Sequence, residues 1–288
     1  MAMPSTGTSP RTGPRRWGFS LLALVALVLG WLHQPIERAA YAANRNFDIH
    51  ATRAKLASWP QMTTRHFLLY YPPGQQAAAQ WTLDALTRAL PFEEKNLAVT
   101  SQHRLTVVLY SSQAAMNAAV GLNAHANNIG YTYDGVIDIL SPTAWLGTGQ
   151  AARQQFLTDG PAPHELGHAL LNLKADANYP AWFNEGVAQY EDWRTTGYMW
   201  ITRSNSLHGP LYSMSALDGN FYALANQSRA YREGLALVQY LETAKGHRAF
   251  AQFLGALHNG QSFTAALDQV YGFKSENALF SAWQKTLR

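Results

Sequence analysis

The chain has 288 residues, of which 47% are apolar and 14% are charged, with a net charge of +4 and no cysteine. A chain of this length can form one large domain, or two small ones, with a sizeable core. The absence of cysteine excludes disulfides, thiol nucleophiles and thiolate metal sites, so any metal must be held by histidine and carboxylate. Four basic residues flank an N-terminal apolar segment, and no Lys/Arg block follows in the body of the chain. We therefore expect no nucleic-acid partner.

The N-terminus has the parts of an export signal. Residues 1–16 form a basic leader that we predict to be disordered, and residues 17–32 carry no charge. Residues 40–42 read Ala-Tyr-Ala, which resembles a signal-peptidase site, so 17–32 is either the apolar region of a cleaved signal peptide or a retained membrane anchor. Trp17 and Trp31 at its ends would suit two membrane interfaces. Both alternatives predict an exported protein, periplasmic or anchored in the inner membrane, with residues 33–61 as a linker.

Residues 62–142 predict a small mixed lobe of strands and helices. The apolar runs at 65–74 and 104–112 are typical of strands, and the segment 75–97 predicts a helix that Pro91 interrupts or kinks. Ser112 is a predicted cap for a helix that ends at Gly121. Residues 130–142 predict a hairpin that turns at Asp134-Gly135, with its second strand at 136–140. Residues 43–62 suggest a polar linker or a short helix.

From Pro163 onward the pattern is helical. Four amphipathic segments follow, each closed by glycine or by the end of the chain, and two of them begin with a serine that can cap a helix (231–246, 248–260, 262–272 and 275–288). The expected fold class is therefore α+β: a small mixed β-sheet lobe with helices, followed by a mainly helical lobe, within one domain at 62–288.

The segment PHELGHALLN carries the strongest chemical signal. His164 and His168 lie four residues apart and share one face of a helix, while Leu166, Leu170 and Leu173 lie on the opposite face. In a metal site of this pattern, the two histidines bind zinc and Glu165, turned about a quarter-circle away, serves as general base. The alternative is a chance pair of solvated or core histidines, which would need no third ligand.

The third ligand is predicted in NYPAWFNEGVAQYEDW. Glu185 follows His168 by 17 residues, enough for the first helix to end and a second to return antiparallel. Glu185, Gln189 and Asp192 share one face of that second helix, which begins near Pro180. An ordinary surface helix is the alternative, but the segment around Glu185 is aromatic and largely apolar. We expect one Zn²⁺ per chain, held by His164, His168 and Glu185.

These two motifs resemble those of the gluzincin metallopeptidases. HELGH followed by WFNEGVAQYED is similar to the matching stretches of M1-type aminopeptidases, which are related to thermolysin-type enzymes, and residues 62–288 resemble the small bacterial peptidase MA-like domains. The resemblance implies a zincin-like fold with its active site between the two lobes. It implies that Asn184 and the amide oxygen of Gln189 orient the zinc histidines, and that GVIDILSP is an edge strand on which a substrate peptide could add.

The chain departs from the family's pattern in two ways. Pro161 and Pro163 precede the motif, which predicts that Ala162 stays outside the helix and that His164 lies in its first turn, in a more open or mobile site. No amine-binding motif such as G-x-M-E-N is visible, so the specificity of M1-type aminopeptidases does not carry over.

The predicted function is zinc-dependent hydrolysis of peptide bonds outside the cytoplasm, with a peptide or protein as substrate. Zinc and Glu165 would activate the water, and a further donor would stabilise the oxyanion. Tyr231 is the preferred donor over Tyr222 and His208, although it could equally be a packing tyrosine. Two alternatives remain open: a non-catalytic, zinc-containing peptide-binding or scaffold module at the membrane, and an exported structural protein without metal.

Overall fold

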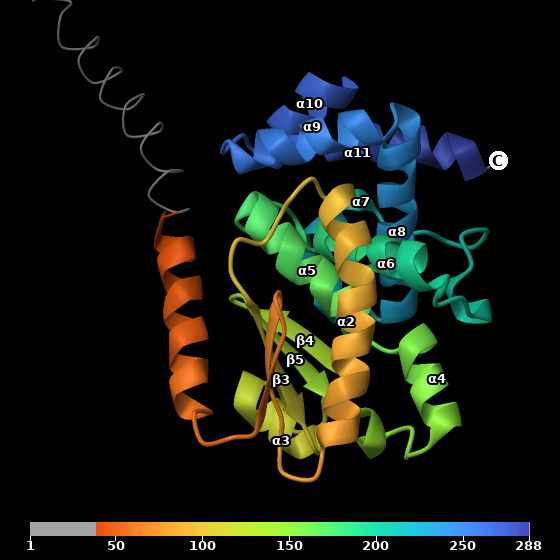
Figure 1. Ribbon diagram of the computed structural model, residues 1–288. Helices are drawn as coiled ribbons and strands as arrows, with labels where there is room; N and C mark the ends of the chain where they lie inside the picture. Colours follow the sequence, from red (N-terminus) through yellow and green to blue (C-terminus); the bar gives the residue numbers. More distant parts are fainter. Residues whose placement is uncertain (1–38, 288) are drawn as a thin grey trace, which may run out of the picture. The chain divides into compact units, whose positions relative to one another are not determined.

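The computed structural model describes residues 39–287 (Figure 1). Contacts divide the chain into residues 1–40 and a compact unit of residues 41–288, and the features below belong to the second. The predicted leader and apolar segment, 1–16 and 17–32, lie outside the described residues. Within the described part, no helix has both the length and the apolar character needed to cross a membrane. The stretch 43–62 is helical through residue 55, and a short strand begins near its end.

A five-stranded mixed sheet forms the first lobe, with the order β1-β2-β3-β5-β4. The strands are β1 (Gln61–Thr63), β2 (Phe67–Tyr70), β3 (Leu105–Tyr110), β4 (Gly130–Tyr133) and β5 (Val136–Leu140). Strands β2, β3 and β5 are parallel, while β1 and β4 pair antiparallel at the two edges. The predicted hairpin is confirmed: its turn residues Asp134 and Gly135 have φ of 45° and 80°, as a two-residue hairpin turn requires.

The prediction of the edge strand is wrong, because the free edge belongs to the neighbouring strand of the hairpin. Val136–Leu140, which we expected along the cleft edge, is β5 and lies between β3 and β4. All five of its residues are buried, as is usual for a strand paired on both sides. The free edge belongs to β4, whose residues are more exposed.

Both faces of the sheet are covered. On one face Leu69, Val107 and Ile137 join the large core that also holds residues of α2 (Gln76–Asn96). On the other face Val108 and Val136 form a smaller core with Met116 of α3 (Gln113–Val120). The boundaries of α3 are as predicted, because the Ser112 side chain accepts the Ala115 N–H and Gly121 ends the helix with φ of 71°. Helix α2 continues through Pro91 without a break.

The second lobe is helical, so the fold is α+β as predicted. Figure 1 shows α5 and α6 between the sheet and the C-terminal helices. The helices are α4 (Gln150–Asp159), α5 (Ala162–Ala175), α6 (Ala181–Thr196), α7 (Met214–Asn220), α8 (Gln227–Ala244), α9 (His247–His258), α10 (Phe263–Tyr271) and α11 (Glu276–Gln284), with 3-10 turns at η1 (Pro142–Ala144), η2 (Arg203–Asn205), η3 (Phe221–Ala223) and η4 (Lys285–Leu287). Ser262 and Ser275 cap α10 and α11, as predicted.

Close packing of α6 on α8 depends on two glycines. A Cβ on Gly186 would lie 2.4 Å from the carbonyl oxygen of Gly234, and a Cβ on Gly234 would lie 2.8 Å from that of Trp182. Either side chain would force the helices apart, because real Cβ atoms do not come this close to backbone. Gly186, which follows Glu185 in the sequence, thus fixes the distance between α6 and α8.

Candidate metal centre and active site

Helix α5 begins one residue earlier than predicted. Ala162 is its first residue, and Pro161 before it has the helical dihedrals φ −75° and ψ −9°. The prediction that Ala162 stays outside the helix is therefore wrong. Proline is tolerated here because the first N–H groups of a helix have no acceptor within the helix. His164 lies in the first turn, as expected, and the Glu165 N–H bonds to the Pro161 carbonyl oxygen at 2.9 Å.

The three predicted ligands lie together. The Nε2 atoms of His164 and His168 are 3.1 Å apart, and each lies 3.4 Å from Oε2 of Glu185. Among residues 39–287, these three residues form the one group of three His, Cys, Asp or Glu side chains close enough to hold a metal ion. Leu166 and Leu170 on the opposite face of α5 are fully buried in the core, and Leu173 packs against it.

This triangle fits a tetrahedral zinc ion. Zinc binds histidine nitrogen and carboxylate oxygen at about 2.0–2.1 Å, which places neighbouring ligands of a tetrahedron about 3.3–3.4 Å apart. In addition, Oε2 of Glu185 is buried without a hydrogen-bond partner among the described residues. A buried carboxylate oxygen without a partner is costly, and a cation between it and the two imidazoles would satisfy it.

Each histidine has a partner for its second ring nitrogen. Nδ1 of His168 lies 2.9 Å from Oδ1 of Asn184, and Nδ1 of His164 lies 3.4 Å from Nε2 of Gln189. Asn184 therefore contacts a ligand histidine as expected. Gln189 reaches the expected ring, but with its amide nitrogen instead of the predicted oxygen.

The ligand charges stabilise one another. Burial alone would raise the pKa of Glu185, but the charge of His168 and the close approach of both histidine rings hold it far below its usual range. For His168, burial lowers the pKa, and the carboxylates of Glu185 and Glu165 outweigh it and raise the pKa to about 9. These opposite shifts show that α5 and α6 bring together groups with strong mutual attraction.

Glu165 lies buried beside the triangle, with 4% of its surface exposed. Thr132 of the edge strand β4 donates to its Oε2 at 2.8 Å. A Cβ on Gly130 would lie 2.5 Å from Oε1, so only glycine leaves room for this carboxylate. Burial raises the pKa of Glu165, while the charges of His168 and His164 and the Thr132 bond lower it. Neither Thr132 nor Gly130 was found from the sequence, because no motif joins β4 to α5.

Two tyrosines approach the site from the segment after α6. The Tyr222 hydroxyl donates to Oε1 of Glu185 at 2.8 Å. The Tyr231 ring lies 6.5 Å from the His164 ring, and burial is the main cause that raises its pKa, followed by the charge of Glu185. Both line the same cavity, whereas His208 is exposed and does not. Of the three donors considered from the sequence, two lie at the site.

The triangle and Glu165 open into a cavity of about 1150 Å³. Its walls come from β4, from α5 and α6, and from the segments on either side of them. The stretch 157–161 contributes Asp159 and Pro161, and the stretch 195–219 contributes Tyr198 and Trp200. Both stretches, whose positions the sequence left open, therefore border the site. Asp192, the third residue of the predicted polar face of α6, also lines it, and burial raises its pKa to about 7.

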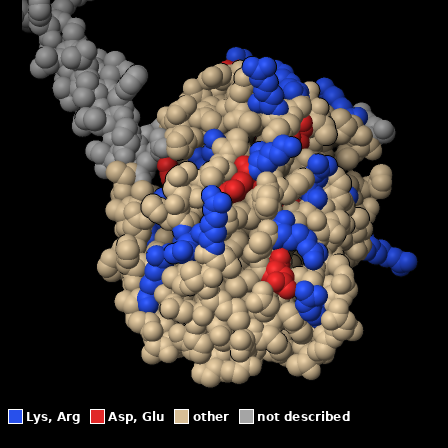
Figure 2. All heavy atoms as spheres, viewed as in Figure 1, with Lys and Arg blue, Asp and Glu red and all other residues tan. Residues whose placement is uncertain are grey.

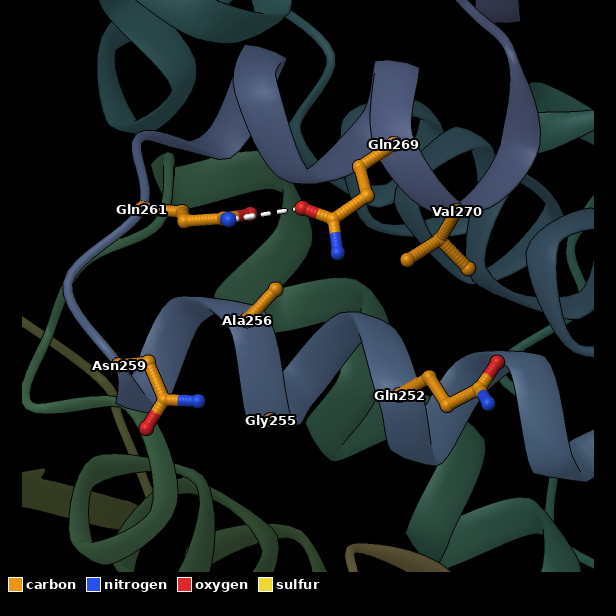
Figure 3. Close-up of a pocket in the computed structure, with 7 residues that line it drawn as sticks. All are labelled: Gln252, Gly255, Ala256, Asn259, Gln261, Gln269 and Val270. Carbon is orange, nitrogen blue, oxygen red and sulfur yellow. Dashed lines mark hydrogen bonds between the residues drawn. The ribbon is translucent and has the colours of Figure 1, made fainter.

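A second cavity of about 400 Å³ lies between α9 and α10 (Figure 3). Its lining is built from amide and small side chains, and Gln261 donates to Gln269 across it at 2.7 Å. None of its seven lining residues is titratable, so it offers no acid, base or metal ligand.

Comparison with known protein families identifies the class. The Peptidase MA superfamily matches residues 85–288, so the chain belongs to this superfamily. Its members are peptidases and are typically zinc-dependent, in agreement with a His-His-Glu group close enough to bind a metal. Among curated proteins, sequence comparison finds no match.

Among solved structures, the chain is similar to aminopeptidase A of Legionella pneumophila, crystallised in complex with aspartic acid. The two share 14% sequence identity, with a TM-score of 0.48. The similarity covers 78% of this chain but 27% of the aminopeptidase, so the chain spans about a quarter of that protein's length.

Proposed function

We propose that the protein is a zinc metallopeptidase of the gluzincin type, with His164, His168 and Glu185 as ligands and Glu165 as general base. The observation that carries this proposal is the 3.1–3.4 Å triangle of ligand atoms, with an unpartnered carboxylate oxygen, beside a buried glutamate at the wall of a large cavity. Bound zinc would lower the pKa of water and polarise the scissile carbonyl.

Glu165 moves the proton. Its carboxylate takes a proton from the attacking water and delivers it to the leaving amine. The hydrogen bond from Thr132 to Oε2 fixes the rotation of the carboxylate, and the glycine at 130 gives Oε1 its space. Placement of this kind matters because proton transfer requires the base within hydrogen-bond reach of the water.

Asn184 and Gln189 orient the ligand histidines. A histidine that binds metal through Nε2 carries its proton on Nδ1 and donates it to an acceptor. Oδ1 of Asn184 is already placed to accept from His168. The Gln189 amide reaches His164 with its nitrogen, and a half-turn of the amide presents the oxygen that the metal-bound tautomer requires.

Tyr231 is the proposed donor to the oxyanion. It borders the cavity next to His164, whereas the hydroxyl of Tyr222 is engaged with Glu185. The free edge of β4 also borders the cavity, so a substrate peptide can add to it as a further strand. We further propose that the domain acts outside the cytoplasm, on the strength of the apolar N-terminal segment at 17–32.

The variant Glu165→Gln tests the proposal. It keeps the size of the side chain and removes the base, so zinc content should stay at one ion per chain while hydrolysis of casein falls by at least about 100-fold. Zinc is measured by elemental analysis and hydrolysis by the release of acid-soluble peptides. Activity that persists in Glu165→Gln would overturn the assigned mechanism.

The same measurements separate the alternatives. A peptide-binding or scaffold module at the membrane predicts one zinc per chain and no turnover of any peptide by the wild type. A structural protein without metal predicts no zinc in carefully purified protein. The buried base beside the ligands favours the peptidase over both, because a scaffold has no use for a desolvated carboxylate at that position.

A further inference from the structure

The large cavity is lined by acidic side chains, whereas basic side chains are more numerous on the rest of the described molecule. Outside the cavity, residues 39–287 have 17 Lys and Arg residues against 12 Asp and Glu residues. Figure 2 shows Lys and Arg side chains spread over one outer face, with few acidic ones between them. The cavity, in contrast, has no Lys or Arg among its described lining residues, whereas five are acidic: Asp134, Asp159, Glu165, Glu185 and Asp192. Two of these five belong to the proposed catalytic machinery, which leaves three without a role.

Asp159 and Asp192 border the cavity on the side of His164. Asp159 ends α4 and is partly exposed, whereas Asp192 on α6 is 5% exposed. Their charges interact, because Asp159 contributes to raising the pKa of both Asp192 and Tyr198. Asp192 accepts a hydrogen bond from Thr196 at 3.1 Å. None of the ion pairs between described residues involves either aspartate. Asp159 therefore presents a carboxylate to the cavity, and Asp192, whose pKa is raised by burial, presents a carboxyl group that a bound cation would help to ionise.

An aromatic wall lies on the same side. The Trp200 ring is 6.0 Å from the Tyr231 ring, which in turn is 6.5 Å from the His164 ring. Trp200 is 40% exposed although it is a large aromatic residue, and it lines the cavity together with Tyr198. An open indole face attracts cations and covers aliphatic chains, and carboxylates bind ammonium and guanidinium groups. Together, the aspartates and the aromatic rings suit a Lys or Arg side chain, whose charged end can contact the carboxyl groups while its aliphatic part lies on the rings.

We propose that this part of the cavity is a specificity subsite for a basic side chain, and that the substrates are peptide segments with Lys or Arg at the position that enters it. This inference rests on the proposed function and names its substrate class. A Glu side chain in the same place would meet the like-charged Asp159 carboxylate beside the buried Asp192 carboxyl, and would be rejected. The basic outer surface offers no comparable attraction for such a segment, so the preference arises in the cavity itself.

The test uses quenched fluorescent decapeptides of neutral sequence. A single Lys, norleucine or Glu is placed at each position in turn, and norleucine matches the lysine stem without its charge. We expect one position at which kcat/KM for Lys exceeds that for norleucine by about tenfold, with Glu below both. Asp159→Asn should lower kcat/KM for the Lys peptide and so remove most of this ratio. The control Asp218→Asn, at an exposed site away from the cavity, should keep it.

Three results would overturn the subsite. Equal kcat/KM for the Lys, norleucine and Glu peptides would show that the cavity does not select by charge. A Lys preference that survives Asp159→Asn but disappears in Asp134→Asn would move the subsite to the β4–β5 turn. A preference that does not weaken between about 0.05 and 0.5 M salt would exclude a charge interaction with partly exposed Asp159.

A binding experiment separates this proposal from the proposed function. Fluorescence anisotropy of labelled Lys and norleucine peptides is measured with Glu165→Gln, in which turnover is not required. Tighter binding of the Lys peptide, lost when Asp159→Asn is added, supports the subsite even if the wild type cleaves nothing. Cleavage by the wild type with no charge preference in either assay leaves the peptidase standing and overturns the subsite.

Discussion

Two glutamates on helix α6, Glu185 and Glu191, are buried to nearly the same degree and behave in opposite ways. Glu185 is 5% exposed and Glu191 is fully buried. Burial acts against ionisation at both, yet the pKa of Glu185 lies far below the usual range and that of Glu191 is raised to about 8. Glu185 faces two imidazoles across the cavity, whereas Glu191 faces the core, where Asn96 donates to its Oε1.

The difference shows which buried carboxylate indicates a metal. Glu185, Glu191 and Glu93 each have a buried oxygen without a hydrogen-bond partner among the described residues. Only Glu185 has nitrogen ligands within 3.4 Å of that oxygen. Glu93 on α2 meets the charges of Glu191 and Asp192 instead, and burial with these charges raises its pKa well above the usual value. A buried carboxylate oxygen without a hydrogen-bond partner therefore indicates a metal site where histidine nitrogens surround it. Where only other acidic groups surround it, it indicates a protonated acid.

The largest effect expected from this comparison is on zinc affinity. Glu185→Gln replaces a charged ligand oxygen with a neutral amide, and we expect the zinc Kd, measured by chelator competition, to rise by more than about 100-fold. Glu191→Gln is the matched control on the same helix and should change the Kd by less than about threefold. Circular dichroism confirms that both variants fold. Equal losses of affinity in the two variants would show that the comparison is wrong.

The next effect is on stability. Between the ordinary carboxyl pKa of 4.5 and its raised folded-state pKa, Glu93 keeps a proton in the folded protein that the unfolded chain has released. The free energy of unfolding therefore falls as the pH rises through this range, and Glu191 adds to the fall up to about pH 8. Glu93→Gln is neutral at every pH, so it should flatten the slope. The free energy of unfolding of Glu93→Gln relative to the wild type should therefore be more favourable at pH 8 than at pH 5.

Urea unfolding at pH 5 and pH 8 measures this slope. The neighbouring residue Glu94 is partly exposed and accepts the Ser101 N–H. Glu94→Gln keeps an oxygen for that bond and should retain the slope of the wild type. A Glu93→Gln variant that loses stability equally at both pH values would show that Glu93 is ionised in the folded protein.

Features with a local cause were predictable from the sequence. The Asp134-Gly135 turn and the Ser112 and Gly121 boundaries of α3 follow from the backbone conformation or hydrogen bond of one or two residues. The helical spacing of His164 and His168 places them on one face, and they lie together with Glu185. In contrast, strand β1 has only three residues and no apolar alternation, and α4 follows two glycines without a clear stripe, so neither was predicted.

Features that depend on tertiary packing were not predictable. Thr132 contacts Glu165 across 33 residues and Tyr222 contacts Glu185 across 37, with no spacing rule between them. The edge position of β4 depends on which side of β5 meets β3, and a hairpin pattern does not determine this. Ala162 lies in α5, enclosed by the helical hydrogen bond from the Glu165 N–H to the Pro161 carbonyl oxygen, although the local rule for residues before proline disfavours a helical conformation there.

The smallest effect concerns the second oxygen of Glu185. The Tyr222 hydroxyl donates to Oε1 at 2.8 Å, which leaves Oε2 alone to face the two histidines. Tyr222→Phe removes this bond, so the carboxylate gains rotational freedom, and we expect the zinc Kd to rise by about tenfold with little change in stability. Tyr131→Phe is the control, because Tyr131 lines the same cavity and has no hydrogen bond to Glu185 among those in the structure. If Tyr222→Phe binds zinc as tightly as Tyr131→Phe, the α6 backbone and the two histidines alone hold Glu185, and the contrast with Glu191 then rests entirely on the imidazoles.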